Sequence, residues 1–94
     1  MDDVLDILNR IISVLEESSE GHWLKTFDKI SKNYETLTDD EKVVYRRRLL
    51  LRIYGGMGSF SDLVLYKNNK VLYKENNELD ALRKDLFEEL RKGL

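Results

Sequence analysis

Hydrophobic positions recur at helical spacing along most of the chain. From Val4 to Leu15, apolar side chains take one half of a helical wheel at about 100° per residue, and polar side chains take the other half. Asp2 and Asp3 stand at the start of this segment, where the helix dipole favours negative charge. The pattern predicts an amphipathic helix that ends near Ser18.

A narrower apolar stripe follows, with members alternately four and three residues apart: Trp23, Phe27, Ile30, Tyr34 and Leu37. This heptad-like spacing indicates a helix whose seam faces another helix. Because aromatic side chains dominate core burial, we expect the stripe to be a core face.

Thr38 and Glu41 form the sequence signature of a capping box, in which each side chain accepts a hydrogen bond from the other's backbone. A third helix is therefore expected from this point to about Tyr54. Its apolar residues fall on two faces, one with Val43, Val44, Leu50, Leu51 and Tyr54 and the other with Tyr45, Leu49 and Ile53. A helix that is apolar on two faces is usually packed between neighbours, so we expect this helix to be the central one.

Two β-prone runs, residues 63–67 and 70–74, are separated by Asn68 and Asn69. Asparagine tolerates the positive φ angles of a two-residue turn, so the pattern predicts a β-hairpin. An alternative is that residues 62–67 continue as a helical turn.

A last helix is expected from Asn76 or Asn77, since asparagine is a good N-cap. Its buried stripe is expected to comprise Leu79, Leu82, Leu86, Phe87 and Leu90. No repeat, low-complexity tract or long linker divides the chain. The sequence therefore predicts one domain over residues 1–94, mainly α, with four helices and a β-hairpin between helices three and four.

The composition disfavours several classes of function. The 94 residues include 16 basic and 18 acidic side chains, one histidine and no cysteine, for a net charge of −2. Without cysteine there is no disulfide framework and no thiolate metal ligand. His22 has no nucleophile and orienting acid at a spacing that would make it a general base. We therefore expect no enzymatic activity, no cofactor and no metal.

The charge balance and the apolar runs also bear on the partners. Acidic residues in every predicted helix leave no dominant positive field for a nucleic-acid backbone. The apolar runs are far shorter than the ~20 residues that span a bilayer, and the acidic start does not resemble a signal peptide. We expect a cytoplasmic protein that binds neither nucleic acid nor membrane.

The segment after the third helix is rich in glycine: Gly55, Gly56, Met57, Gly58 and Ser59 follow one another. Such a segment either forms a nest of backbone N–H groups that binds an anion or makes a tight connection that glycine alone permits. The spacing fits neither phosphate-binding fingerprint, which favours the tight connection.

Two arginines of the third helix project toward apolar positions. Arg47 falls in the middle of one apolar face, and Arg46 falls between Leu50 and Ile53. An unpaired buried charge costs several kcal/mol, so Arg47 is expected to have a partner, for which Asp62 is the first choice. Arg47 either holds the glycine segment onto the third helix as a structural fork, or lines a pocket with Arg46 for an anionic ligand or a partner's carboxylate.

The segment Gly55-Gly56-Met57-Gly58-Ser59-Phe60, followed by Asp62-Leu63-Val64-Leu65, resembles the motif GGMGSFNDLVL of a family of small uncharacterised bacterial proteins. The pair His22-Trp23 with Phe27, and the leucine-rich last helix, also resemble that family, so the similarity covers roughly residues 20–92. At Ser61 the family usually has asparagine. The family is a domain of unknown function, and the resemblance implies a standalone bacterial cytoplasmic protein, of a kind associated with immunity or other partner-neutralising roles.

Together these features lead to two hypotheses of function. The first is a non-enzymatic protein-binding module, such as an immunity-type protein, in which the glycine segment with Tyr66 and Tyr73 is central to the contact. The alternative is a small protein that binds an anionic ligand through the loop amides with Arg46 and Arg47. The sequence is also compatible with a homodimer.

Overall fold

The computed structural model describes residues 3–18, 20–56, 60 and 63–92, with residues 54–56 described by their backbone alone. In chain order the elements are α1 (Asp3–Glu16), α2 (Gly21–Glu35), α3 (Asp39–Leu50), the π-helix η1 (Leu51–Gly56), β1 (Tyr66–Lys67), β2 (Lys70–Val71) and α4 (Tyr73–Arg91). The prediction of a mainly α fold, with four helices and a β-hairpin between the third and the fourth, is confirmed.

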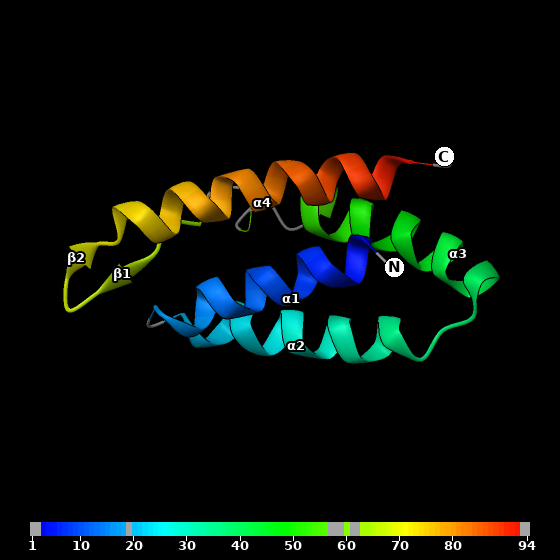
Figure 1. Ribbon diagram of the computed structural model, residues 1–94, viewed down its shortest axis with the longest axis horizontal. Coiled ribbons are helices and arrows are strands. Elements are labelled where there is room, and N and C mark those ends of the chain that lie inside the picture. The colour runs from blue at the N-terminus through cyan, green and yellow to red at the C-terminus, as the bar shows by residue number, and fades with distance from the viewer. Residues whose placement is uncertain (1–2, 19, 57–59, 61–62, 93–94) are drawn as a thin grey trace.

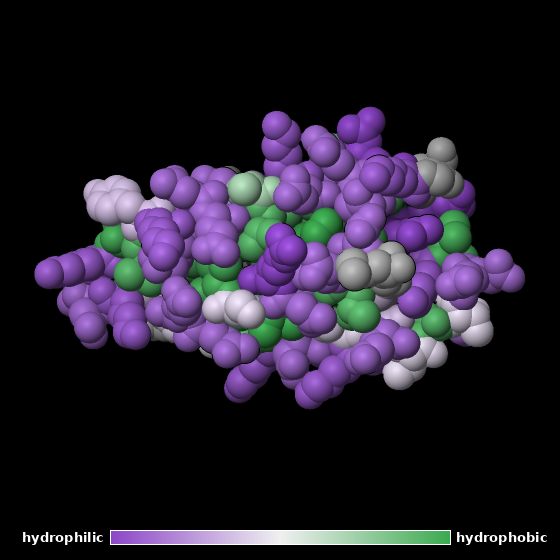
Figure 2. Space-filling view, in the orientation of Figure 1, coloured by the Kyte–Doolittle hydropathy of each residue, from purple (hydrophilic) through white to green (hydrophobic). Residues whose placement is uncertain are grey.

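The helices form an elongated bundle, 43 × 22 × 21 Å along its principal axes. The hairpin lies at one end of the bundle, and the connection between α2 and α3 lies at the other (Figure 1). In the same orientation, polar side chains cover most of the visible face, and hydrophobic side chains surface in patches between them (Figure 2).

The central helix is α1, which lies between α2 and α4 and packs against both (Figure 1). It buries six apolar side chains: Val4, Ile7, Leu8, Ile11, Val14 and Leu15. The expectation that the third helix is central is wrong, since α3 buries only Leu49 and leaves Val44 exposed. Arginines interrupt both apolar faces of α3, so neither face offers a continuous apolar stripe for a neighbour to cover.

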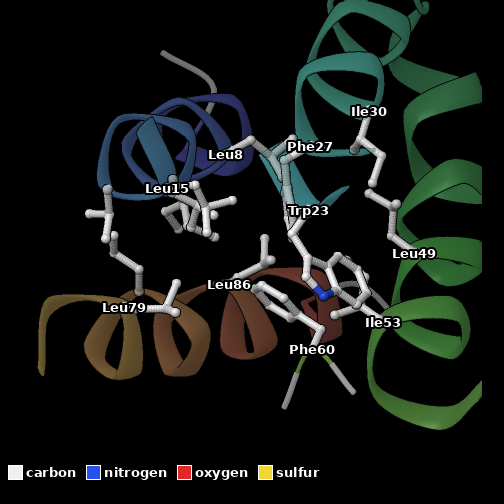
Figure 3. Packing of buried hydrophobic residues seen from close by; sticks show 14 of the residues in the cluster. Leu8, Leu15, Trp23, Phe27, Ile30, Leu49, Ile53, Phe60, Leu79 and Leu86 are labelled. Atoms are coloured by element: carbon white, nitrogen blue, oxygen red, sulfur yellow. The ribbon is translucent and has the colours of Figure 1, made fainter. Parts of the chain in front are cut away.

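The stripe of α2 is a core face, as predicted. Trp23, Phe27, Ile30 and Tyr34 are buried, and Leu37 is half-buried against the same cluster. Figure 3 shows Trp23 and Phe27 pointing from α2 toward the interior, where α1, α3 and α4 also contribute side chains.

The capping box at the start of α3 is confirmed. The Thr38 N–H donates to Glu41 Oε1 at 2.9 Å, and the Glu41 N–H donates to Thr38 Oγ1 at 3.3 Å. The hydrogen bonds from the Thr38 backbone and side chain lower the pKa of the Glu41 carboxyl. At the start of α2 the capping residue is Glu20, whose Oε1 accepts from His22 N and Trp23 N; this cap was not predicted from the sequence.

The hairpin forms around Asn68 and Asn69, whose φ angles are 54° and 64°. Positive φ at both central residues is the geometry of a two-residue type I′ turn. The register pairs Tyr66 with Val71, which excludes a helical turn that reaches residue 67. Each strand is only two residues long, shorter than the predicted runs.

The last helix begins at Tyr73, and its N-cap Leu72 makes no side-chain capping bond. The expectation that Asn76 or Asn77 is the N-cap is therefore wrong. Asn76 lies within the first turn of α4, where its side chain bonds the backbone of the preceding hairpin. The side-chain amide of Asn76 thus makes a tertiary contact with the hairpin instead of capping the helix as the capping preference of asparagine predicts.

Candidate functional site

Phe60 anchors the chain between the glycine segment and the hairpin. Its side chain is fully buried, with ring centroids 5.0 Å from Trp23 and 4.7 Å from Phe27. Figure 3 shows Phe60 pointing toward Trp23 from the side of α4. The aromatic stripe of α2 therefore forms the receptor for this residue.

Arg83 of α4 holds the same segment by its backbone. Its Nη1 donates to the carbonyl oxygens of Phe60 at 2.7 Å and Leu63 at 3.2 Å. Its Nη2 pairs with Asp80 one turn earlier, and the guanidinium lies 5.7 Å from the centroid of the Phe60 ring. The Arg83 side chain is only 13% exposed, so these contacts replace most of its hydration. Arg83 therefore makes the kind of structural fork that was one of the two alternatives for Arg47.

Arg47 lies on the exposed side of α3. The expectation of a buried Arg47 is wrong, because α3 contacts the core through Leu49 and turns the face around Arg47 toward solvent. Asp62, the partner expected for Arg47, lies outside the described residues.

Arg46 is half-buried and projects into a depression between α1, α3 and α4. Four carboxylates line this depression with it, those of Asp3, Asp39, Asp40 and Glu89. Lys42 is the other basic side chain of the lining. Arg46 and Arg47 therefore face different surroundings, and the depression around Arg46 carries more acidic than basic groups.

Only some of the candidate residues of the glycine segment are among the residues that the structure describes. Gly55 and Gly56 are the last two residues of η1, so the helix continues as a π-helix before it ends. Met57, Gly58 and Ser59 lie outside the described residues.

Asn76 joins α4 to the hairpin. Its Oδ1 accepts from the N–H of Leu65 at 2.7 Å, and its Nδ2 donates to the carbonyls of Leu65 at 3.0 Å and Leu72 at 2.8 Å. The Leu72 N–H also donates to the Leu65 carbonyl, at 3.0 Å, which extends the pairing beyond the two short strands. The side-chain amide thus binds both polar groups of one backbone residue, as a neighbouring strand would.

Three apolar or aromatic side chains of this region remain exposed. The exposed fraction is 45% for Val64, 51% for Tyr66 and 78% for Tyr73. Leu65, between the first two, is fully buried, because successive residues of an extended chain point to opposite sides. We call Val64, Tyr66 and Tyr73, with the exposed Lys67, Lys70 and Lys74, the hairpin surface. It occupies the end of the bundle shown at β1 and β2 in Figure 1.

Other candidate chemistry is not assembled in the described part of the chain. His22 is exposed in the first turn of α2. Among the described residues, no group of three or more histidine or carboxylate side chains could hold a metal ion. No described helix is both long enough and apolar enough to cross a membrane.

The fold and this surface define a small four-helix domain that presents a β-hairpin at one end. The chain belongs to the DUF6966 family, a domain of unknown function whose sequence profile matches residues 16–74. No curated protein and no solved structure matches the chain. The matched segment includes Phe60 and the hairpin, whereas Asn76 and Arg83, which hold that segment, lie beyond it.

Proposed function

We propose that this chain is a non-enzymatic protein-binding module that contacts its partner through the hairpin surface. The observation that carries the proposal is the exposure of Tyr66 and Tyr73, at 51% and 78%, beside the half-exposed Val64. Tyrosines are enriched among the residues that dominate binding energy, since they bury a large area at low cost in conformational entropy.

The contacts beneath the hairpin surface support this proposal. The Asn76 side chain bonds the N–H and the carbonyl of Leu65, and Arg83 donates to the carbonyl of Leu63. Hydrogen bonds therefore hold the backbone on both sides of Val64. A surface that is already ordered loses little entropy on binding, which favours affinity.

The charge of the hairpin surface indicates the chemistry of the partner. Lys67, Lys70 and Lys74 are exposed: Lys67 and Lys70 are paired across the hairpin, on the side opposite Tyr66, and Lys74 follows Tyr73. Opposite charge at the rim of an interface speeds encounter and sets orientation. The partner surface is accordingly an apolar patch bordered by carboxylates.

The alternative of an anionic ligand has weaker support. Arg46 faces a depression lined by four carboxylates, and Arg47 points to solvent, so the two guanidinium groups do not converge on one ligand.

A more specific proposal is that binding neutralises the partner, as an immunity protein does. Its support is the association of small helical bacterial proteins with such roles, and not the geometry of this chain. It predicts that a reading frame beside this gene arrests growth when expressed alone and that coexpression of this chain relieves the arrest. Continued arrest would contradict neutralisation and leave binding itself to be tested directly.

The binding proposal is tested by affinity capture from the native cell with a matched pair of variants. Lys74→Glu changes the hairpin surface, whereas Lys84→Glu makes the same change at an exposed position further along α4. We expect a protein retained at equal stoichiometry by the wild type and Lys84→Glu but lost with Lys74→Glu and with Tyr73→Ala. Equal retention by all four, or no retained protein, would contradict the proposal.

A further inference from the structure

The outward side of α3, with one leucine just before the helix and one at the start of η1, carries a pattern that is symmetric about Val44. Leucines stand seven residues to either side of it, at Leu37 and Leu51. Carboxylates lie three and four residues before it, and guanidinium groups lie three and four residues after it. We call this set the α3 strip; its members are Leu37, Asp40, Glu41, Val44, Arg47, Arg48 and Leu51.

The α3 strip lies on the surface of the domain. Val44 is 50% exposed and Leu51 is 70% exposed, the four charged side chains are all exposed, and Leu37 is half-buried against the core. At its N-terminal half the strip is hollowed, and the hollow is lined by Leu37, Glu41, Val44, Tyr45 and Arg48. An exposed leucine at one end of the strip is thus matched by an apolar recess at the other.

The charges of the strip are not paired with one another within the chain. Seven residues of helix separate Asp40 from Arg47 and Glu41 from Arg48, which is about 10 Å along the axis. That separation is too large for an ion pair, and none joins these groups in the described part of the chain. The helix dipole favours acids at the start and bases at the end of α3. The dipole does not explain why Val44, which lies between the acidic and basic groups, and Leu51, which follows the basic groups, are exposed.

We propose that the α3 strip binds a second copy of this chain, with the two α3 helices antiparallel across a two-fold axis at Val44. In that arrangement Asp40 and Glu41 of each copy face Arg47 and Arg48 of the other. Leu51 of each copy enters the hollow beside Leu37 of the other. An isologous contact needs a surface that is complementary to itself, and a strip whose charges reverse across its centre meets that requirement.

The dimer goes beyond the proposed function and uses a different part of the molecule. The hairpin lies at the end of the bundle opposite the start of α3 (Figure 1). Pairing through α3 therefore leaves both hairpin surfaces exposed, and two linked sites bind a multivalent partner more tightly than one. Because one helix face gives an interface at the small end of the known range, the association is expected to depend on concentration.

The first experiment is sedimentation equilibrium of the purified full chain from micromolar to millimolar concentration. We expect a reversible monomer–dimer equilibrium and at least a tenfold rise of its dissociation constant for Leu51→Ala. Because Leu51 is mostly exposed, the melting temperature of dilute Leu51→Ala should stay that of the wild type. A wild type that remains monomeric, or an unchanged dissociation constant for Leu51→Ala, would overturn the proposal.

The second experiment exchanges charges between the two halves of the strip. Arg47→Glu/Arg48→Glu makes the strip wholly acidic. Asp40→Arg/Glu41→Gln makes it basic and keeps a side chain that can form the capping box. Each variant alone should be monomeric, and an equimolar mixture should form a dimer that contains one copy of each.

The matched control is Lys70→Glu/Lys84→Glu, which alters the net charge as much as the acidic variant but lies outside the strip. It should dimerise like the wild type. Dimerisation of the acidic variant by itself, or a mixture of two folded variants that stays monomeric, would show that the α3 strip is not the interface.

Discussion

Arg83 binds Phe60 in two ways: its Nη1 donates to the Phe60 carbonyl at 2.7 Å, and its guanidinium lies 5.7 Å from the centroid of the Phe60 ring. The two residues are 23 positions apart in the chain. One side chain of α4 therefore holds both the backbone and the ring of the residue that anchors the segment before the hairpin.

Arg83→Ala is expected to destabilise the fold by about 2 to 3 kcal/mol, since the hydrogen bonds from its charged guanidinium to the carbonyls of Phe60 and Leu63 are lost. For a domain of this size the melting temperature should fall by roughly 10 to 20 °C. Arg83→Lys should give an intermediate loss, because an ammonium cannot reproduce the fork. Fluorescence of Trp23, which contacts Phe60, reports the change, and the exposed Lys84→Ala is the control.

Asn76→Ala should weaken the attachment of the hairpin to α4. The change removes the acceptor of the Leu65 N–H and one donor each to the Leu65 and Leu72 carbonyls, while the Leu65 carbonyl keeps its bond from the Leu72 N–H. A loss of about 1 to 3 kcal/mol is expected, chiefly because the Leu65 N–H is left without its acceptor. Amide hydrogen exchange at Leu65 should quicken in Asn76→Ala and stay unchanged in Asn77→Ala, the exposed neighbour. Unchanged exchange in both variants would show that the amide does not hold the hairpin.

The turn residue Asn69 should tolerate glycine and reject valine. Its φ of 64° is open to glycine, whereas a β-branched residue there is strained by about 1 to 2 kcal/mol. Thermal melts should show Asn69→Gly within error of the wild type and Asn69→Val clearly below it. Equal stability of the two variants would exclude a type I′ turn.

Glu41 should make stability depend on pH in a direction set by its lowered pKa. Because folding favours the carboxylate, its contribution is fully present above the ordinary value of 4.5 and is lost as the pH falls through the lower folded-state pKa. The wild type should therefore exceed Glu41→Gln in melting temperature at neutral pH, and the difference should shrink in acid. A Glu88→Gln control, at an exposed position of α4, corrects for the change in net charge.

Arg47→Ala should leave stability within about 0.5 kcal/mol of the wild type when measured on dilute protein. The side chain is exposed, so its removal uncovers no buried partner in the described structure. Chemical denaturation provides the measurement. A loss of several kcal/mol would instead indicate a buried and paired Arg47.

The helices, the caps and the turn that sequence reasoning found depend on neighbours within a turn or two. The α2 stripe, the Thr38 box and the two asparagines of the hairpin all appear as predicted. Thr38 and Glu41 interact across three residues, so the pattern that encodes their contact is visible in a short window of sequence.

The candidate site was predicted less well, because its contacts join distant segments. A helical wheel placed Arg47 in an apolar face, but a wheel does not show which face another helix covers. The role of Arg83 was not predicted. The available signal in the sequence was its spacing: it stands four residues after Leu79 and three before Leu86, on the helix face that those leucines share. Tyr66 and Tyr73 were predicted from the sequence to contact a partner. Both side chains are exposed, and their role in binding stays a prediction.

By itself the sequence determined that four helices and the turn form, and most of their positions, because apolar periodicity and capping chemistry act locally along the chain; the start of α4 at Tyr73 was not predicted. Only the tertiary structure decided that α1 is central, that Arg83 rather than Arg47 holds the segment at Phe60, and that the outer side of α3 faces solvent. Those outcomes depend on which apolar faces cover one another and on hydrogen bonds between residues more than twenty positions apart, and neither is specified by any one segment of the chain.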